Sequence, residues 1–249
     1  MMSIPDRLLR LQGASNFRDL GGYPGHGGRP LRWRRIFRSD HLAGLTDSDR
    51  ISLSDLGLAH ALDFRGVEES AQTPYQLPGV TRHTLSIEPT VVQRLQARID
   101  GGQALDAAIV SDLMADLYRR LVDAEAPRFA ALFMHLLRTD VPLVFHCTAG
   151  KDRTGLAAAL LLLALGTPRD VVMQDYLLTN QHYRHPPQPQ SSLPADALRV
   201  LWGVQPAFLE AALAEIDSRQ GGLPNYLQRR LGLDRAALAA LAERYLQAD

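Results

Sequence analysis

Cysteine and lysine are almost absent from this chain of 249 residues. Cys147 is the only cysteine, and Lys151 is the only lysine beside 26 arginines. A single cysteine excludes an internal disulfide, which suits a reducing compartment, and it leaves no second thiol to resolve an oxidised one. The two rare residues stand four positions apart. The unusual chemistry of the chain is therefore concentrated in one short segment.

Long apolar runs and an excess of one charge are also absent. The longest apolar run spans residues 156–165, well short of the roughly 20 residues that cross a bilayer. The first 12 residues carry scattered charges and no apolar core typical of a signal peptide. We therefore expect a cytoplasmic protein that is not integral to a membrane, with export by another route as the alternative. A net charge of zero predicts no nucleic-acid partner, and the oligomeric state stays open.

Residues 143–165 have the pattern of a strand, a tight loop and a helix. Residues 143–145 are apolar and rich in β-branched and aromatic side chains, which is typical of a buried strand. Residues 156–165 are almost all Ala and Leu, which predicts a helix buried on every side. Gly150 and Gly155 allow tight turns and a close approach of the backbone to a ligand. Cys147 thus stands at the start of a loop that leads into a helix.

Such a loop can bind an anion. Free N–H groups at a helix N-terminus and the helix dipole attract phosphate. Arg153, six residues after Cys147, can close the site with a bidentate fork onto two oxygens. The same potential stabilises a thiolate, which is then a nucleophile aimed at phosphorus. A nucleotide-binding Walker loop is excluded, because it needs Ser or Thr after the lysine, and Asp152 follows Lys151.

The segment His146-Cys-x-x-Gly-Lys-Asp-Arg-Thr-Gly155 resembles the phosphate-binding loop of cysteine-dependent protein tyrosine phosphatases, in particular the bacterial tyrosine/serine phosphatase branch. Further segments similar to that family lie at residues 16–22, 37–39, 62–65, 175–180, 225–227 and 231–233. The resemblance implies a phosphoric monoester hydrolase that works through a phosphocysteine intermediate. It implies phosphorylated protein as substrate, with phosphotyrosine first and phosphoserine or phosphothreonine as further candidates. This chemistry needs no cofactor.

Two aspartates are candidates for the general acid that protonates the leaving oxygen. The Trp-Pro-Asp tripeptide that holds this acid in conventional tyrosine phosphatases is absent. Asp63 follows an apolar stretch at the expected carboxyl end of a strand, where ligand sites of α/β proteins form. Its alternative role is an ion pair with Arg65. The resemblance implies that Asp152 and Lys151 act in catalysis or substrate binding, so Asp152 is slightly favoured; its alternative role is to orient Arg153 or cap the helix.

Other residues of the loop have supporting roles. Lys151 can bind a second phosphate, such as that of a phosphoinositide headgroup, or remain a solvated residue at the rim. His146 is expected to hydrogen-bond the backbone of Cys147, or to be a packed neutral ring. Thr154 can donate to the thiolate or cap the helix. Three further residues are expected to line the bound phosphate: Thr148, Ala149 and Gly150.

Three arginines and two histidines outside the loop are further candidates for roles in structure, substrate binding or metal binding. We expect Arg18 and Arg38 to pair with aspartates at position 19, 40 or 175. We expect Arg65 to be the exception that contacts the substrate. No metal site is predicted at His182 and His185, because no carboxylate or thiol lies near them in the sequence.

The alternation of strands and helices predicts one α/β domain over residues 1–249, with a short, largely parallel sheet flanked by helices and a helical C-terminal region. Strands are expected at 32–37, 60–64 and 79–87 in addition to the loop strand. Residues 88–125 have the poorest family likeness and are expected to carry a helical lid over the active-site mouth. Helices are expected at 47–56 with Thr46 as N-cap, 105–122, 127–137, 168–183 with Thr167 as N-cap, 196–202, 206–218, 223–231 and 234–246.

Three other functions compete with a protein phosphatase. A pseudophosphatase that only binds phosphorylated partners is disfavoured, because a nucleophile, an arginine and two candidate acids are all present. A phosphoinositide phosphatase stays open because of Lys151 and the missing Trp-Pro-Asp. A sulfurtransferase of the rhodanese type is disfavoured, because it would not need Arg153 followed by Thr and Gly.

Overall fold

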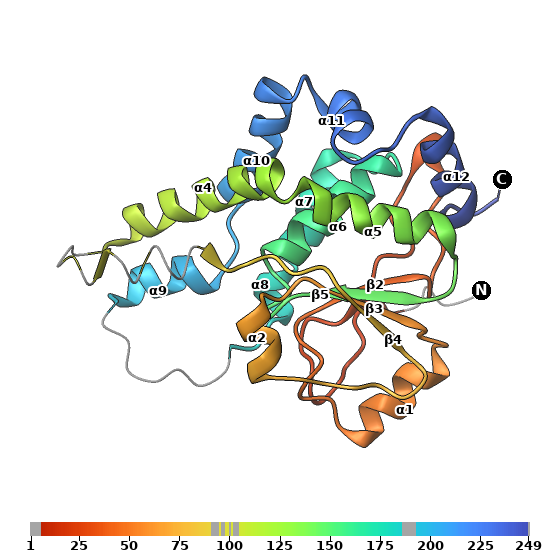
Figure 1. The fold of residues 1–249 in the computed structure, drawn as a ribbon, viewed down its shortest axis with the longest axis horizontal. Helices are drawn as coiled ribbons and strands as arrows, with labels where there is room; N and C mark the ends of the chain where they lie inside the picture. The colour runs from red at the N-terminus through yellow and green to blue at the C-terminus, as the bar shows by residue number, and fades with distance from the viewer. Residues whose placement is uncertain are drawn as a thin grey trace.

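The computed structural model describes residues 6–90, 95, 98–99, 101, 105–185 and 193–248. A five-stranded sheet in the order β1-β2-β5-β3-β4 lies at its centre (Figure 1). β1 pairs antiparallel with β2, and the other neighbours pair in parallel. The predicted short, largely parallel sheet is therefore confirmed. In the order of the sheet, the strands are Arg18–Asp19, Ile36–Ser39, Leu143–His146, His60–Asp63 and Thr81–Thr84.

Helices surround this sheet and make up the whole C-terminal part of the described chain, as predicted. The first group is α1 (Asp47–Asp55), α2 (Val67–Gln72), α4 (Ala107–Ala124), α5 (Ala126–Arg138) and α6 (Arg153–Ala164). The second group is α7 (Arg169–Leu177), α8 (Thr179–His182), α9 (Ala195–Trp202), α10 (Pro206–Arg219), α11 (Leu223–Arg229) and α12 (Arg235–Tyr245). Within the described ranges, no helix has both the length and the apolar character needed to cross a bilayer.

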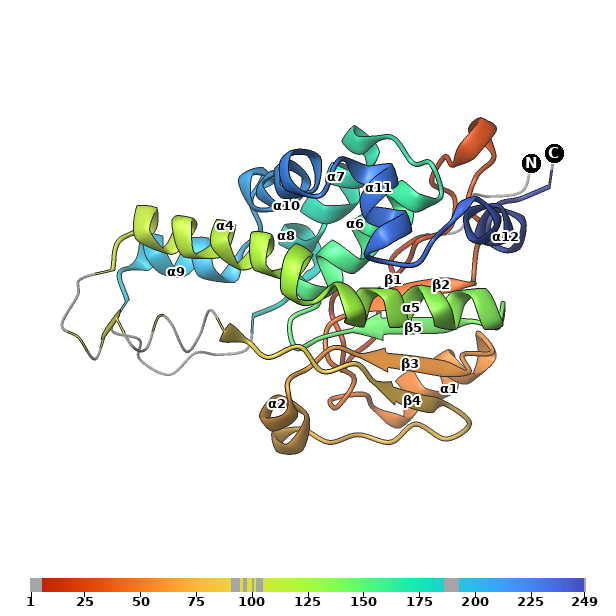
Figure 2. The same ribbon diagram turned by 45° about the horizontal axis from the view of Figure 1, so that its top comes forward.

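The two faces of the sheet pack against separate hydrophobic clusters. Phe37, Ala61 and Val144 belong to the smaller cluster, on the side of α1. Leu62 and Phe145 belong to the larger cluster, on the side of the main helical layer. Successive side chains of a strand point to opposite faces, so these strands are buried on both sides. Figure 1 shows α1 and α2 below the sheet and α5, α6, α7 and α10 above it, and Figure 2 shows the strands side by side.

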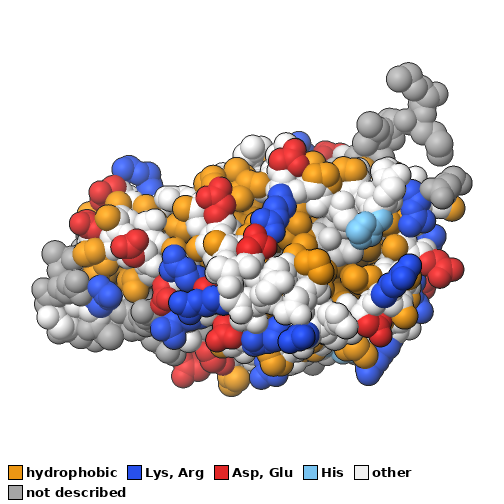
Figure 3. Space-filling model, turned by 90° about the horizontal axis from the view of Figure 1, so that it is seen from above, with side chains coloured by type: hydrophobic (Ala, Val, Ile, Leu, Met, Phe, Trp, Pro, Cys, Tyr) orange, Lys and Arg blue, Asp and Glu red, His pale blue; other side chains and the backbone are white. Residues whose placement is uncertain are grey.

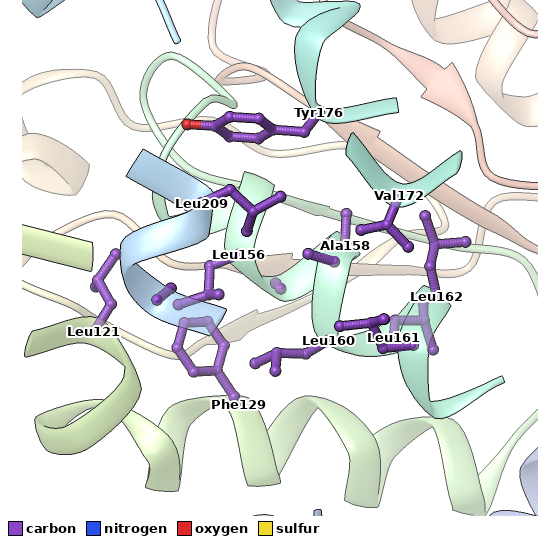
Figure 4. Close-up of a cluster of buried hydrophobic side chains, with 14 of the residues drawn as sticks. Leu121, Phe129, Leu156, Ala158, Leu160, Leu161, Leu162, Val172, Tyr176 and Leu209 are labelled. Atoms are coloured by element: carbon purple, nitrogen blue, oxygen red, sulfur yellow. The ribbon is translucent and has the colours of Figure 1, made fainter. Parts of the chain in front are cut away.

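The helix α6 is the centre of the larger cluster, as its Ala and Leu composition predicts. Its side chains are buried all round. Figure 4 shows them between Leu121 of α4, Phe129 of α5, Val172 and Tyr176 of α7 and Leu209 of α10. Because interiors are close-packed, this helix is held firmly, and so is the loop that feeds into its first turn.

Several predicted boundaries are wrong. The strand expected at 32–37 is shifted to Ile36–Ser39, because Arg34 adopts a left-handed conformation with φ 63° and ends any extended run there. Pro168, not Thr167, is the N-cap of α7, and the helix expected to continue to 183 divides at Leu178. Thr46 is confirmed as the N-cap of α1, with a capping box. The short elements β1 and α2 were not predicted.

The segment expected to form a lid contains α4. The helices α4 and α9 lie side by side and extend beyond the sheet (Figures 1 and 2). Residues 91–94, 96–97, 100 and 102–104, which belong to the same expected lid, lie outside the described residues. On the face shown in Figure 3, acidic and basic side chains are intermixed, in keeping with the net charge of zero.

Candidate active site

The loop around Cys147 joins the central strand β5 to the buried helix α6. β5 lies between β2 and β3, so the loop leaves the carboxyl edge near the middle of the sheet. Cys147 is a free thiol and is 2% exposed. The predicted order of strand, loop and helix is confirmed. The helix begins at Arg153, so Thr154 lies inside its first turn, and the expected N-cap role of Thr154 is wrong.

Gly150 lets the loop pack directly against the end of β2. Its φ is +65°, and a Cβ atom there would lie 2.4 Å from the carbonyl oxygen of Ser39. No other residue fits that conformation and that contact without a shift of the backbone. The carbonyl oxygen of Gly150 accepts hydrogen bonds from Arg38 at 2.8 Å and from Asn16 at 3.1 Å. The loop is thus fixed by contacts with two neighbouring segments.

A buried ionic network supports this loop from behind. Arg18 and Arg38 donate to opposite oxygens of Asp175, at 3.0 and 2.7 Å, and all three side chains are at most 1% exposed. Burial alone would raise the pKa of Asp175, but the two guanidinium groups hold it well below its usual range. The expectation that Arg18 and Arg38 pair with aspartates is confirmed, with Asp175 as their shared partner.

A pocket of about 290 Å³ opens above the loop. The loop and the start of α6 contribute Cys147, Thr148, Ala149, Lys151, Asp152 and Arg153 to its lining. Apolar side chains form much of the rest: Pro89, Met114, Leu117, Leu121, Leu201 and Trp202. Glu69 and Glu88 complete it. The pocket therefore combines a polar loop around a thiol with an apolar wall from α4 and α9.

Arg153 is held by a carboxylate that sequence analysis missed. Its terminal nitrogens donate to the two oxygens of Glu69, at 2.6 and 3.0 Å. The hydroxyl of Thr148 also donates to Glu69. Burial alone would raise the pKa of Glu69, but hydrogen bonds from Arg153 and Thr148 lower it to about 2. Glu69 was missed because the polar helix α2 shows no apolar periodicity. Glu69 stands three residues after Gly66 and accepts a hydrogen bond from its N–H. This spacing at the start of a helix was the sequence signal that could have pointed to Glu69.

Asp152 and Lys151 form a pair at the pocket. Nζ of Lys151 lies 2.7 Å from Oδ2 of Asp152, and Lys151 is only 8% exposed. The alternative of a solvated rim lysine is therefore wrong. The hydroxyl of Tyr118 donates to Asp152 Oδ1 at 3.0 Å. The hydroxyl oxygens of Tyr118 and Tyr176 lie 2.6 Å apart and share a hydrogen bond. Neither tyrosine was predicted, because both stand at ordinary core positions of their helices.

Asp63 and Arg65 lie outside the pocket lining. Both are fully buried, and Arg65 donates to both oxygens of Asp63. Arg82 adds an ion pair at 2.8 Å. Burial alone would raise the pKa of Asp63, but the electrostatic interaction with His146 and the hydrogen bonds and charge of Arg65 lower it. Arg65 is thus engaged with Asp63 in this structure, and the expected contact between Arg65 and a bound substrate is not supported by its position.

His146 contacts the backbone of Cys147, as expected. Its Nδ1 lies 3.2 Å from the carbonyl oxygen of Cys147, and its Nε2 lies 2.6 Å from the hydroxyl of Tyr75. Burial lowers the pKa of His146 to about 4. The ring is therefore neutral near pH 7, with Nδ1–H donating to the carbonyl and Nε2 accepting from Tyr75. Thr154 Oγ1 is buried and has no hydrogen-bond partner among the described residues.

Comparison with known proteins identifies the family of this chain. The family model described as the tyrosine phosphatase family matches residues 9–247. The chain belongs to the tyrosine phosphatase family. A Cupriavidus necator protein, provisionally named a tyrosine-protein phosphatase, is 34% identical over 90% of this chain and 84% of its own. The triple specificity protein phosphatase PtpB of Mycobacterium tuberculosis is 30% identical over 93% of this chain and 96% of its own.

A tyrosine-protein phosphatase of Nostoc commune is also 30% identical, over 85% of this chain and 74% of its own. The resemblance inferred from the loop is thereby confirmed for nearly the whole chain. The prediction of a cysteine-dependent phosphoric monoester hydrolase is confirmed with it. Residues 88–125, where the likeness in sequence is poorest, fall within the matched range.

Proposed function

We propose that this tyrosine phosphatase hydrolyses phosphotyrosine in proteins and also accepts phosphoserine and phosphothreonine. The observation that carries the proposal is the pocket in which Cys147 and Arg153 share one lining with an apolar wall. A phenyl ring can pack on that wall while its phosphate lies on the loop. The name of the Mycobacterium tuberculosis relative, a triple specificity protein phosphatase, supports the wider range of substrates.

In the proposed reaction, the thiolate of Cys147 attacks phosphorus, so that a sulfur–phosphorus bond forms and the bond to the leaving oxygen breaks. Arg153 binds the phosphate oxygens during both steps. Its hydrogen bonds within the described chain all come from the two terminal nitrogens. The edge of the Arg153 guanidinium that carries Nε remains available to donate to the substrate phosphate. Water then attacks the phosphocysteine and releases phosphate.

Asp152, not Asp63, is the proposed general acid. Asp152 lines the pocket, and Lys151 and Tyr118 fix its carboxylate there. Asp63 is fully buried and bound by Arg65, so it can deliver no proton to a leaving group in the pocket. Asp152 protonates the leaving oxygen in the first step and accepts a proton from water in the second. Thr148, Ala149 and Gly150 present their backbone to the phosphate.

We further propose that residues 1–249 form a single domain in which α4 covers the active site. Met114, Leu117 and Leu121 of α4 line the pocket together with Leu201 and Trp202 of α9. Both helices extend past the sheet (Figure 1) and pack against each other, so they form this cover together. We also propose the cytoplasm as the compartment, since a catalytic thiol must stay reduced.

The test is phosphate release from three substrates in parallel: a phosphotyrosine peptide, a phosphoserine peptide and a soluble phosphoinositide. Cys147→Ser is the blank. Turnover of both peptides supports the proposal. Faster turnover of the phosphoinositide would replace it with a lipid phosphatase, in which Lys151 binds the headgroup. Binding without turnover of any of the three would make the chain a phosphate-binding module.

A further inference from the structure

Three histidines meet away from the active-site loop. His60 is the first residue of β3, His83 lies in the neighbouring strand β4, and His135 belongs to α5. One ring nitrogen of each lies within 4.8 Å of those of the other two. His60 and Asp63 are at opposite ends of β3, and Asp63 is the register partner of His146 in β5, next to the active-site loop. The histidines therefore lie at the end of the strand far from that loop. None of the three lines the pocket above Cys147.

The spacing of these nitrogens is close to that of a metal-binding set. Three imidazoles at about 2.0–2.1 Å from a tetrahedral Zn²⁺ hold their nitrogens roughly 3.3 Å apart. Nε2 of His83 and Nδ1 of His60 already lie 3.1 Å apart. Nε2 of His135 is buried and has no hydrogen-bond partner among the described residues. The His135 nitrogen lies within 4.8 Å of the other two, so the set must contract by at most about 1.5 Å to reach the spacing of a zinc site.

The rings come from two paired strands and a helix that packs into the core. β3 and β4 are hydrogen-bonded neighbours, and α5 packs through Phe129, Leu132 and Phe133 into the larger cluster. The rings of His60 and His135 have centroids 4.6 Å apart, as do those of His83 and His135. A site on strands and a packed helix is more precisely held than one on loops.

We infer that His60, His83 and His135 bind a divalent transition-metal ion of the Zn²⁺ class, with water in the fourth position. Imidazole ligands suit zinc, copper, nickel and cobalt, whereas magnesium and calcium prefer oxygen. The cluster contains three imidazoles and no carboxylate. The ion would join the edge strand β4 and its neighbour β3 to α5, and it would take no part in phosphate chemistry. The competing interpretation is a cluster of hydrogen-bonded neutral rings.

The experiment measures zinc binding by equilibrium dialysis of the full chain with the substitution Cys147→Ser, which removes the thiol as a rival ligand. We expect a single equivalent of zinc, and X-ray absorption should give a first shell of nitrogen with the signature of imidazole. His135→Gln and His83→Gln should each weaken binding by at least about 10-fold, as loss of metal-site groups does. Zinc should raise the melting temperature of the parent and of neither variant.

The matched control is His182→Gln, which removes a half-buried histidine outside the cluster and should leave zinc binding unchanged. With Cys147 intact and a chelator present, His83→Gln and His135→Gln should hydrolyse an aryl phosphate like the wild type, which shows that they fold. Absence of saturable binding of zinc, copper, nickel and cobalt would overturn the inference. Unchanged zinc affinity in folded His83→Gln and His135→Gln would overturn it equally.

Discussion

At the scale of single residues, the two candidate acids differ by their surroundings. Asp152 reaches the pocket with Lys151 and Tyr118 beside it, whereas Asp63 is enclosed by Arg65 and Arg82. A carboxylate that must exchange a proton with a substrate needs contact with it. A carboxylate that binds the buried Arg65 and the half-buried Arg82 is needed for structure instead. In the proposed mechanism, these identical side chains therefore have different functions because their neighbours differ.

Asp152→Asn should slow hydrolysis of a phosphoserine peptide by about 10²–10⁴-fold, the usual contribution of a general acid. An activated aryl phosphate should be slowed far less in the first step, because its leaving group needs no proton. Burst kinetics with both substrates separate the two steps. Equal slowing of the burst for both substrates would count against Asp152 as the acid.

Glu69 is a positioning residue for Arg153. It binds the terminal nitrogens of the guanidinium and also accepts from Thr148 and the N–H of Gly66. Glu69→Ala should let Arg153 rotate and lower kcat/KM by about 100-fold, because small misplacements of catalytic groups have effects of that size. Glu69→Gln should recover part of the loss. An increase in kcat/KM in Glu69→Ala would instead mean that Glu69 blocks the phosphate site.

At the scale of elements, the active-site loop depends on one close contact between backbones. Gly150 combines a positive φ with a Cβ position 2.4 Å from the carbonyl oxygen of Ser39. Gly150→Ala must therefore displace the loop from β2. We expect a loss of kcat/KM of at least about 100-fold, measured on an aryl phosphate.

Gly57→Ala is the matched control for Gly150→Ala. Gly57 has a similar φ of +67°, but apart from its chain neighbours no atom of the described residues lies within 4 Å of its Cβ position. The control should lose about 1–2 kcal/mol of stability through backbone strain and keep its kcat/KM. Similar activity losses in both variants would mean that the loop is not specifically fixed by the Ser39 contact.

The helix α9 supplies Trp202 to the wall of the pocket, whose lining also includes the loop between β5 and α6. Trp202→Ala should raise KM for a phosphotyrosine peptide by about 10-fold, since apolar contacts in a pocket contribute about 1–3 kcal/mol to substrate discrimination. KM for a phosphoserine peptide, which has no ring to pack, should change less. Equal changes in KM for both peptides would mean that Trp202 does not recognise the aromatic ring.

At the scale of the whole molecule, Asp175 joins the N-terminal strands to the helical layer. It binds Arg18 of β1 and Arg38 of β2, although it lies in α7. Asp175→Asn leaves two buried cations without a counter-charge and should reduce the free energy of unfolding by about 3–5 kcal/mol. Urea denaturation measures this loss.

The same pair of proteins should differ in their response to acid. The pKa of Asp175 is depressed in the folded state by the two arginines, so its contribution to stability is complete above the unfolded pKa of about 3.9. It is lost as the pH falls through the folded pKa. The stability gap between wild type and Asp175→Asn should therefore narrow below about pH 4.

The exposed pair of Arg169 and Asp217 is the control for the buried network. Its side chains are 50% and 44% exposed, and Asp217→Asn should reduce the free energy of unfolding by less than about 1 kcal/mol. A similar loss in Asp217→Asn and Asp175→Asn would mean that burial of the charges is not what makes Asp175 important.

The sequence by itself determined the loop around the only cysteine and the fold class. Cys147, Gly150 and Arg153 lie in one continuous segment, and the strand and helix around them have strong local patterns, so their arrangement follows from chain geometry alone. The alternation of strands and helices likewise predicted the largely parallel sheet. Thr46 was predictable for the same reason, because a capping box is a contact between residues three apart.

Only the tertiary structure decided which distant residues serve that centre. Glu69 and Asp63 are both acidic residues near the end of β3, but packing directs Glu69 to Arg153 and encloses Asp63 between arginines. The pairing of His60 with His135, 75 positions away in the sequence, has no local signal either. Such contacts depend on how elements pack against one another, and the side-chain pattern of a single element does not encode its neighbour.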